Sequence, residues 1–265
     1  MNSRDSREQE IIRSWHANAA PWSEAIRSAS IASRKLVTDQ AIIDAVKKAT
    51  TSASLADVFG PRVLDVGCGE GWLARALCEL GMRVTGVDIV PDLIAQAVAL
   101  KDAASLGPPF RDLQIPGVQI GKTWGTVAFQ VQDYESIASR HWRAGPFDAA
   151  VCNFSLLGGE SVDSLIAALP FYLAENGYLV IQTLHPVAAC GALPYQDGWR
   201  EGSWQGFSGA FRTPAPWYFR TLESWRTLLE RCGFDILECR EPKAPGAVTP
   251  SSVIWIGKRR QAVQT

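Results

Sequence analysis

Residues 63–71 read VLDVGCGEG, and this stretch decides the fold. It joins a short apolar β-type run over residues 62–66 to a helical pattern that continues through residue 80. Glycines at this point let the backbone turn tightly and approach a ligand closely, and the turn aims the N-terminus of the helix at that ligand. The stretch therefore predicts a ligand-binding loop at the carboxyl end of the first strand.

The spacing of the acidic residue and the glycines limits the kinds of ligand that the loop can bind. A dinucleotide fingerprint, G-x-G-x-x-G, would need Gly at positions 67, 69 and 72, but position 72 is Trp72. The chain has D-x-G-x-G-x-G instead, which puts the carboxylate of Asp65 where a dinucleotide site would hold a diphosphate. We therefore expect a ligand with a cationic end. A second β-type run, residues 83–87, ends at Asp88, whose carboxylate can hold both hydroxyls of a ribose.

Further β-type and helical runs alternate along the chain. Helical patterns cover residues 92–104, 162–173 and 222–231, and the remaining β-type runs cover 126–131, 147–152, 178–183, 234–239 and 253–257. Such alternation predicts an α/β fold, with a mostly parallel, Rossmann-like sheet of seven strands and helices on both faces.

Two segments fall outside this alternation. Residues 1–59 form a helical preface, with one helix from about residue 11 to 28 that Pro21 is expected to interrupt. A second helix there has apolar residues at 41, 42, 45, 46 and 49, which make one amphipathic face. Residues 186–220 follow the fifth strand, are rich in Gly, Pro and aromatic residues, and show no clear period. We therefore expect an insertion at this place in the domain.

Composition excludes several classes of function. The chain has 26 Lys and Arg against 27 Asp and Glu, so we expect no broad electrostatic attraction to nucleic acid or to an anionic membrane. Its apolar runs fall short of the ~18 residues of a membrane span, and the first ten residues lack the apolar stretch of a secretory signal. Six Cys without C-x-x-C spacing and three His argue against a metal site and for free thiols in a reducing cytoplasm.

On these residues the sequence resembles the class I S-adenosylmethionine-dependent methyltransferases, in their small-molecule branch, over about residues 61–257. The resemblance implies S-adenosyl-L-methionine as cofactor, S-adenosyl-L-homocysteine as product, and a last strand, 253–257, that runs antiparallel. It also implies a domain over residues 60–265 with a substrate lid at 186–220, and a cap over the active site at 1–59.

The resemblance carries the cofactor roles onto particular residues. Asp65, Gly67, Cys68 and Gly69 would hold the methionine end, Asp88 the ribose, Ile89 the adenine ring, and Arg34 the cofactor carboxylate. Gln132, Asp133 and Tyr134 follow the third strand, with Asp133 facing the adenine amino group, and Asn153 follows the fourth strand near the transferred methyl. Three alternatives stay open: Asp133 as a helix cap, Asn153 as a turn cap and Arg34 as an exposed side chain.

His185 is the candidate general base. It directly follows the fifth strand and precedes Pro186, at the sheet edge where open α/β folds bind ligands. The alternative is a His that hydrogen bonds loop backbone and shapes the pocket.

Aromatic residues of the two covers are the candidate substrate wall: Trp22, Tyr195, Trp199, Trp217, Tyr218 and, with them, Arg220. The alternative for each of these residues is packing of the insertion onto the sheet. Seven of the ten Trp fall on the glycine loop and the covers, namely Trp15, Trp22, Trp72, Trp199, Trp204, Trp217 and Trp225, whereas Trp255 is expected in the core.

These features predict a cytoplasmic enzyme, a monomer or homodimer, that methylates O or N of a small aromatic or heteroaromatic molecule of the secondary-metabolite type. Carbon stays open as the target atom. A nucleic-acid methyltransferase is disfavoured because residues 153–156 read NFSL rather than N/D-P-P-Y. A protein methyltransferase and a cofactor-binding module without catalysis remain alternatives, and Trp72 disfavours a nicotinamide dehydrogenase.

Overall fold

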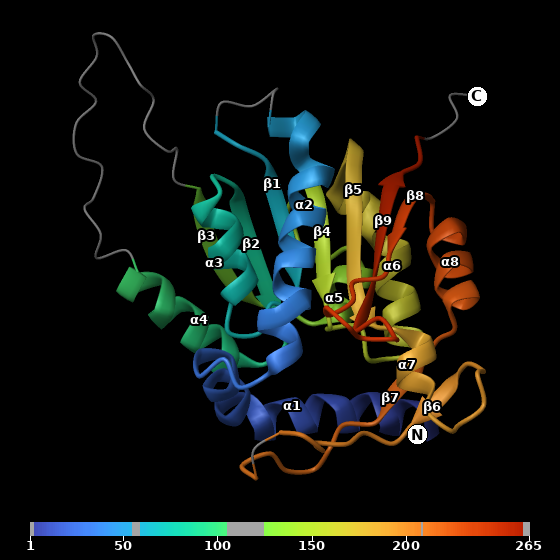
Figure 1. Cartoon of the computed structure of the whole chain (residues 1–265). Helices are drawn as coiled ribbons and strands as arrows, with labels where there is room; N and C mark the ends of the chain where they lie inside the picture. Colours follow the sequence, from blue (N-terminus) through green and yellow to red (C-terminus); the bar gives the residue numbers. More distant parts are fainter. Residues whose placement is uncertain (1–2, 55–58, 105–124, 208, 262–265) are drawn as a thin grey trace, which may run out of the picture.

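A seven-stranded sheet forms the centre of the molecule in the computed structural model (Figure 1). The structure describes residues 3–54, 59–104, 125–207 and 209–261. The strand order is β3-β2-β1-β4-β5-β9-β8. The strands are β1 Arg62–Val66, β2 Arg83–Asp88, β3 Thr126–Val131, β4 Phe147–Asn153, β5 Leu173–Leu184, β8 Phe234–Arg240 and β9 Ser252–Arg259.

The pairing confirms the predicted fold class. Strands β3, β2, β1, β4 and β5 pair in parallel, whereas β9 pairs antiparallel with both β5 and β8. The chain order reverses between β1 and β4, and ligands bind at this kind of switch point in open α/β sheets. The β5 strand begins at Leu173, five residues before the predicted start, because Leu173 already pairs with Phe147 of β4.

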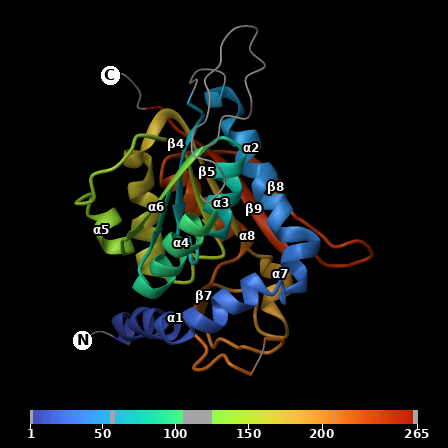
Figure 2. The same ribbon diagram turned by 90° about the vertical axis from the view of Figure 1, so that its left-hand side faces the viewer.

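Helices cover both faces of the sheet (Figure 2). The helices α5 Tyr134–Ala138, α6 Glu160–Tyr172 and α8 Leu222–Arg231 contribute Ile137, Tyr172 and Trp225 to one core cluster. On the other face, α2 Asp39–Ser54 and α3 Trp72–Glu79 contribute Ile42 and Leu77. The predicted amphipathic face of α2 is confirmed, since four of its five positions are buried against the sheet and the fifth is partly buried. Helix α4 Pro91–Ala104 packs on β2 and β3.

Helix α1, Ser3–Arg27, lies across one end of the sheet beside the insertion (Figures 1 and 2). The predicted interruption at Pro21 is wrong: the helix continues through it, and Ala19 and Ala25 on either side are buried. A short π-type turn, η1 Arg34–Thr38, leads into α2. Because α2 packs on the sheet, α1 is the part of the preface that lies over the end of the strands; the domain boundary at residue 59 stays a prediction.

The insertion has local structure that its aperiodic sequence did not predict. It contains α7 Pro186–Cys190 and a two-stranded antiparallel sheet of β6 Gly198–Arg200 and β7 Trp217–Phe219. Strands of three residues are too short to show an alternating pattern. Among the helices of the described residues, none combines the length and apolarity that crossing a bilayer requires.

Asn18 joins α1 to the insertion. Its side chain is fully buried, its Nδ2 donates to the Arg212 carbonyl oxygen at 2.7 Å, and its Oδ1 accepts from the Arg212 backbone N–H at 2.8 Å. Ser14 Oγ donates to the Thr213 carbonyl oxygen at 2.6 Å one turn earlier. These contacts pack α1 against Arg212 and Thr213 of the insertion and join the two into one cover.

Asn18→Ala tests this cover. Truncation leaves the Arg212 backbone N–H without its partner and removes one of the two donors to the Arg212 carbonyl oxygen, which keeps the Trp204 indole N–H at 2.9 Å. We therefore expect the free energy of unfolding to fall by about 1–3 kcal/mol and residues 209–216 to become more sensitive to protease. Urea unfolding and limited proteolysis measure both effects. Ser6→Ala, which removes an exposed hydrogen bond on the same helix, is the control. Equal behaviour of the two variants would contradict the assigned role.

Candidate active site

The glycine loop between β1 and α3 forms the floor of the site. The backbone N–H groups of Gly67 and Cys68 both donate to the Val87 carbonyl oxygen, at 2.8 and 3.0 Å. Gly67 has a φ of +71°, and a Cβ there would lie 2.3 Å from the Cβ of Ser155. Gly69 has a φ of +57°, and its Cβ position meets only the Trp22 indole nitrogen, at 3.6 Å. Packing therefore requires glycine at position 67. At Gly69 the missing side chain instead leaves the backbone accessible to a ligand that lies over the loop.

Asp88, at the end of β2, closes the floor. Its Oδ2 accepts from the Gly69 backbone N–H and its Oδ1 from the Val90 N–H, both at 2.9 Å. A carboxylate has about four lone-pair positions, so each oxygen keeps one for a ligand hydroxyl. Burial raises the pKa of Asp88 above its usual value, and the two backbone donors oppose that shift. The carboxylate is thus fixed in place before a ligand binds.

A cavity of about 720 Å³ lies over this floor, and it is referred to here as the cofactor cavity. Its wall includes the predicted residues Trp22, Arg34, Gly67, Cys68, Gly69, Asp88, Ile89, Asp133, Tyr134 and Asn153. Asp65 and Gln132 lie outside this wall; Asp65 is buried, and the Gln132 backbone N–H donates to the Asp88 carbonyl oxygen. The sequence analysis missed Glu8, Ile11, Ile12 and Leu157 in the wall. The apolar pair Ile11 and Ile12 at the start of the helical pattern was the available signal.

Two polar atoms in the cavity wall are buried without a hydrogen-bond partner among the described residues: Arg34 Nη1 and Asn153 Oδ1. Arg34 is held by its other groups, because Nε donates to Asp39 Oδ1 at 2.9 Å and the guanidinium lies 4.4 Å from the centre of the Trp72 ring. Buried polar atoms without partners are costly, so both atoms fit a ligand that supplies an acceptor to Arg34 and a donor to Asn153.

Asp65 is a buried carboxyl group behind the glycine loop. Its pKa is raised from 3.8 to about 8, first by burial, then by the negative charges of Asp88 and Glu70, while the Ala74 backbone N–H opposes the shift. Its Oδ2 has no hydrogen-bond partner among the described residues. A cation near the loop would favour the ionised form of Asp65, in line with the sequence prediction.

Asp133 and Tyr134 have structural contacts as well as places in the cavity wall. Asp133 Oδ1 accepts from the Ser136 backbone N–H at 2.6 Å and caps α5. The Tyr134 hydroxyl donates to the Ser155 carbonyl oxygen at 3.0 Å, and burial raises its pKa. The helix-cap alternative for Asp133 is therefore correct, and it is compatible with a ligand contact through Oδ2.

His185 lies apart from the cavity wall. Its side chain is buried, its Nε2 is 2.8 Å from Glu241 Oε1, and its Nδ1 has no partner among the described residues. Glu241 follows β8, and in the sheet β9 lies between β8 and β5. This strand order brings the end of β8 near the end of β5. The structure thus brings His185 to a carboxylate that a sequence period could not link to it.

The predicted substrate residues of the insertion divide into two groups. Trp199, Tyr218 and Arg220 line a second cavity, whereas Tyr195 and Trp217 pack against the ring of Phe219. Of the seven Trp expected in the covers, Trp225 is instead buried in the sheet core, because α8 packs its apolar face on the sheet. Trp255 is core, as predicted, and Trp124 lies outside the described residues. The described residues contain no cluster of three or more His, Cys, Asp and Glu placed to hold a metal ion.

Comparison with known proteins adds independent findings. A family model described as a methyltransferase domain matches residues 32–239. A ubiquinone biosynthesis O-methyltransferase from Xanthomonas axonopodis pv. citri is 34% identical over 134 residues, which cover 51% of this chain and 47% of that protein. The corresponding protein from Xanthomonas oryzae pv. oryzae (strain PXO99A) is 31% identical over 137 residues, covering 52% and 48%. The chain thus spans about half the length of the curated relatives it matches.

Solved structures share the fold. An S-adenosylmethionine-dependent methyltransferase from Mesorhizobium loti superposes with a TM-score of 0.53 at 23% identity, covering 80% of this chain and 98% of that one. The magnesium protoporphyrin IX methyltransferase of Synechocystis PCC 6803, solved with bound S-adenosylhomocysteine, gives 0.51 at 19% identity, covering 83% of each chain.

The raised pKa of Asp65 predicts a pH-dependent effect on stability. Between pH 3.8 and about 8 the folded state holds a proton that the unfolded state releases, so this group lowers the free energy of unfolding as pH rises through that window. Asp65→Asn removes the ionisation, and we expect it to raise the melting temperature relative to the natural chain more at pH 9 than at pH 5. Thermal unfolding at both values measures this difference. A gain that is equal at both values would contradict the assignment.

Proposed function

The chain belongs to the methyltransferase domain family, and on that premise we propose that it transfers a methyl group from S-adenosyl-L-methionine to O or N of a small aromatic or heteroaromatic molecule. The predicted methyltransferase family is confirmed by the family model, and the predicted fold by the related structures. The proposal concerns the reaction, its acceptor and the residues that carry it out. Its main support is the glycine-floored cavity with the fixed carboxylate of Asp88.

Each part of the cavity wall suits one part of the cofactor. Asp88 accepts from the ribose hydroxyls, Ile89 packs on the adenine ring, and Asp133 accepts from its amino group. Arg34 binds the carboxylate through Nη1, the atom without a partner, in a charge-assisted contact. The backbone of Gly67, Cys68 and Gly69 holds the methionine end, whose ammonium and sulfonium charges would favour the ionised form of Asp65. Gln132 acts by fixing the Asp88 backbone.

When bound, the cofactor supplies a methyl group that its sulfonium already activates for displacement. The chain has to align the acceptor, exclude water and receive a proton, and alignment alone can account for many orders of magnitude in rate. Asn153 Oδ1 orients an O–H or N–H of the acceptor. Ile11, Ile12, Trp15 and Leu157 make that part of the wall apolar, which suits a flat ring. The acceptor would release one proton on methylation, and His185 is the candidate group to receive it.

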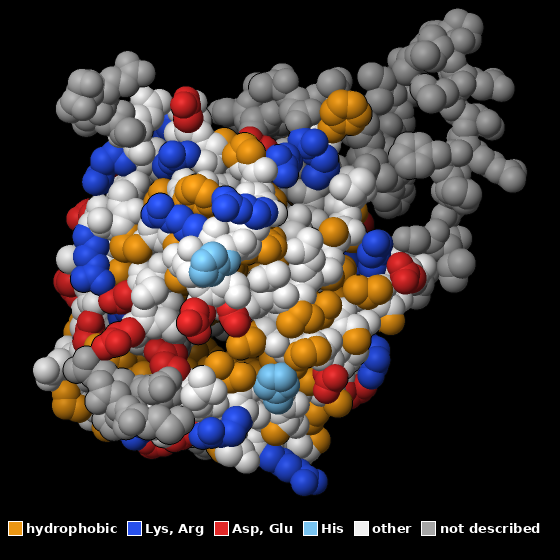
Figure 3. All heavy atoms as spheres, turned by 180° about the vertical axis from the view of Figure 1, so that it is seen from behind, with side chains coloured by type: hydrophobic (Ala, Val, Ile, Leu, Met, Phe, Trp, Pro, Cys, Tyr) orange, Lys and Arg blue, Asp and Glu red, His pale blue; other side chains and the backbone are white. Residues whose placement is uncertain are grey.

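Oxygen is the target atom that the curated relatives favour, since they are described as O-methyltransferases. A nucleic-acid substrate is disfavoured by the overall charge balance of 26 Lys and Arg against 27 Asp and Glu. On the face in Figure 3, Lys and Arg side chains gather over the upper half and a group of Asp and Glu side chains lies toward the lower left. The aromatic cover disfavours a module without catalysis. A cytoplasmic location and a monomeric or homodimeric state remain proposals from the sequence.

Asp88→Ala tests the cofactor assignment. Loss of the two charge-assisted contacts to the ribose hydroxyls should weaken binding of S-adenosylhomocysteine by roughly 10- to 100-fold or more. Isothermal titration calorimetry measures this affinity. Asp92→Ala, an exposed carboxylate in the first turn of α4, is the matched control and should leave the affinity unchanged. Unchanged affinity in Asp88→Ala would overturn the ribose assignment.

His185→Gln tests the base role that the sequence predicts. Glutamine can still hydrogen bond to Glu241 but cannot take a proton near neutral pH. If His185 receives the acceptor proton, kcat falls by roughly 10²–10⁴ while the affinity for S-adenosylhomocysteine stays within about twofold. A methylation assay over phenols, amines and N-heterocycles supplies the substrate for this measurement. An unchanged kcat would remove the role.

A further inference from the structure

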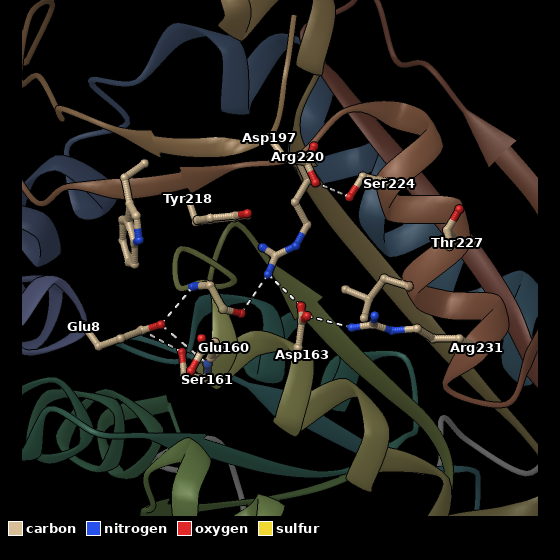
Figure 4. Close-up of a pocket in the computed structure, with 13 residues that line it drawn as sticks. Glu8, Glu160, Ser161, Asp163, Asp197, Tyr218, Arg220, Ser224, Thr227 and Arg231 are labelled. Atoms are coloured by element: carbon tan, nitrogen blue, oxygen red, sulfur yellow. Dashed lines mark hydrogen bonds and ion pairs between the residues drawn. The ribbon is translucent and has the colours of Figure 1, made fainter. Parts of the chain in front are cut away.

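A second cavity, of about 700 Å³, lies between the insertion and helices α6 and α8 (Figure 4). The insertion contributes Asp197, Trp199, Tyr218 and Arg220, and α1 contributes Glu8. The start of α6 contributes Gly159, Glu160, Ser161 and Asp163, and α8 contributes Ser224, Thr227, Leu228 and Arg231. We call it the insertion cavity. Its volume falls in the range of sites for small ligands.

The insertion cavity adjoins the cofactor cavity. Glu8, Glu160 and Ser161 line both. The Tyr218 backbone N–H donates to the Leu157 carbonyl oxygen at 2.7 Å, and Leu157 itself belongs to the wall of the cofactor cavity. A ligand that occupies the insertion cavity therefore lies next to the place where the acceptor is expected to react.

The charged groups of the insertion cavity are already held by partners. Asp163 binds two guanidinium groups, with Arg220 Nη2 at 2.8 Å and Arg231 Nη2 at 2.7 Å. Asp197 accepts from the Thr221 backbone N–H at 2.8 Å and from the Ser224 hydroxyl. Glu8 accepts from the Gly159 backbone N–H at 2.9 Å and from the Ser161 hydroxyl at 2.7 Å. Figure 4 shows these groups arranged around the cavity as a fixed polar frame.

The aromatic wall, in contrast, keeps free polar ends. The Tyr218 hydroxyl and the Trp199 indole nitrogen have no hydrogen-bond partner among the described residues, and the two rings meet edge to face with centroids 5.6 Å apart. The Arg220 guanidinium lies 4.7 Å from the Tyr218 ring centre and orients it. At Gly159 a Cβ would lie 3.3 Å from the Tyr218 ring, so the absence of a side chain there lets the ring sit against α6.

We propose that the insertion cavity binds a neutral, polyhydroxylated part of the methyl acceptor, such as a sugar ring, while the reacting group of the acceptor enters the cofactor cavity. This inference rests on the proposed methyl transfer. Four carboxylates against two guanidinium groups repel an anionic ligand. A cation meets the two guanidinium groups that Asp163 holds in the cavity. Hydroxyl groups can both donate to those carboxylates and accept from Tyr218 and Trp199, and the carbon face of a sugar packs on an indole ring.

Four phenyl probes separate the effect of the sugar ring from the effect of its charge. Phenol, phenyl β-D-glucopyranoside, phenyl β-D-glucuronide and phenyl 2-amino-2-deoxy-β-D-glucopyranoside are titrated into the chain saturated with S-adenosylhomocysteine, and binding is measured by calorimetry or saturation-transfer NMR. We expect the neutral glucoside to bind at least 10-fold more tightly than phenol and than either charged sugar. Equal binding of phenol and the glucoside, or tighter binding of a charged sugar, overturns the inference.

Variants locate the binding. Tyr218→Phe removes the free hydroxyl and should weaken the glucoside by about 3- to 10-fold. Thr227→Trp fills the cavity from the exposed side of α8 and should weaken it by at least 10-fold. Arg226→Trp adds the same ring at the next residue of α8, outside both cavities, and should bind the glucoside as the natural chain does.

Natural-chain affinity in Tyr218→Phe and Thr227→Trp, or an equal loss in Arg226→Trp, would place the glucoside elsewhere and overturn the inference. The melting temperature of each variant shows that it is folded. The affinity for S-adenosylhomocysteine, measured in the same samples, separates the two proposals. If the natural chain does not bind S-adenosylhomocysteine, the proposed methyl transfer is wrong. If it binds S-adenosylhomocysteine but not the glucoside, only the inference about the insertion cavity is wrong.

Discussion

At Gly67 the backbone of the glycine loop comes so close to the loop after β4 that a Cβ there would lie 2.3 Å from the Cβ of Ser155. The same serine donates through Oγ to the Val66 carbonyl oxygen at 2.7 Å and accepts from the Tyr134 hydroxyl. The residue before it, Phe154, has a φ of +54°, a conformation that a bulky side chain adopts only when its surroundings hold it there. This contact fixes the ends of β1 and β4 against each other, and so it sets the positions of the cavity floor and of Asn153.

The electrostatics of the floor match a zwitterionic amino-acid group. Asp65 and Asp88 place carboxyl groups behind and beside the loop, where burial makes their ionised forms costly. Arg34 places an unpaired, buried N–H group on the same wall. An ammonium near the acids and a carboxylate on Arg34 would relieve both costs together. The folded protein without ligand therefore carries an electrostatic cost that ligand binding relieves. The same charged groups thus affect both the affinity for the ligand and the stability of the fold.

The sheet, the glycine loop and the buried face of α2 could be predicted because each depends on local pattern: period, glycine spacing and strand-end acids. What could not be predicted depends on contacts between distant segments. Glu8 meets the start of α6 across 151 residues, and His185 meets Glu241 across 56. Neither pair has a periodic signal. The strands β6 and β7 are set by pairing with each other and by the bond from Tyr218 to Leu157 rather than by their own propensity. Asp133 shows a further limit, since one carboxylate serves as helix cap and lies in the cavity wall.

Helix α1 and the insertion form one packed unit because their aromatic rings pack against each other. Trp15 of α1 meets Trp22 edge to face at 5.2 Å and Trp204 of the insertion at 5.9 Å, and Trp204 packs on Phe211 at 4.7 Å. Indole rings have few rotamers, so they lose little entropy when they are fixed in such a cluster. Glu8 extends the coupling, because its carboxylate supplies acceptors to the first turn of α6 while it forms the wall between the two cavities. Moving α1 away would therefore remove the acceptors of Glu8 from α6, separate the rings and open the wall that the two cavities share.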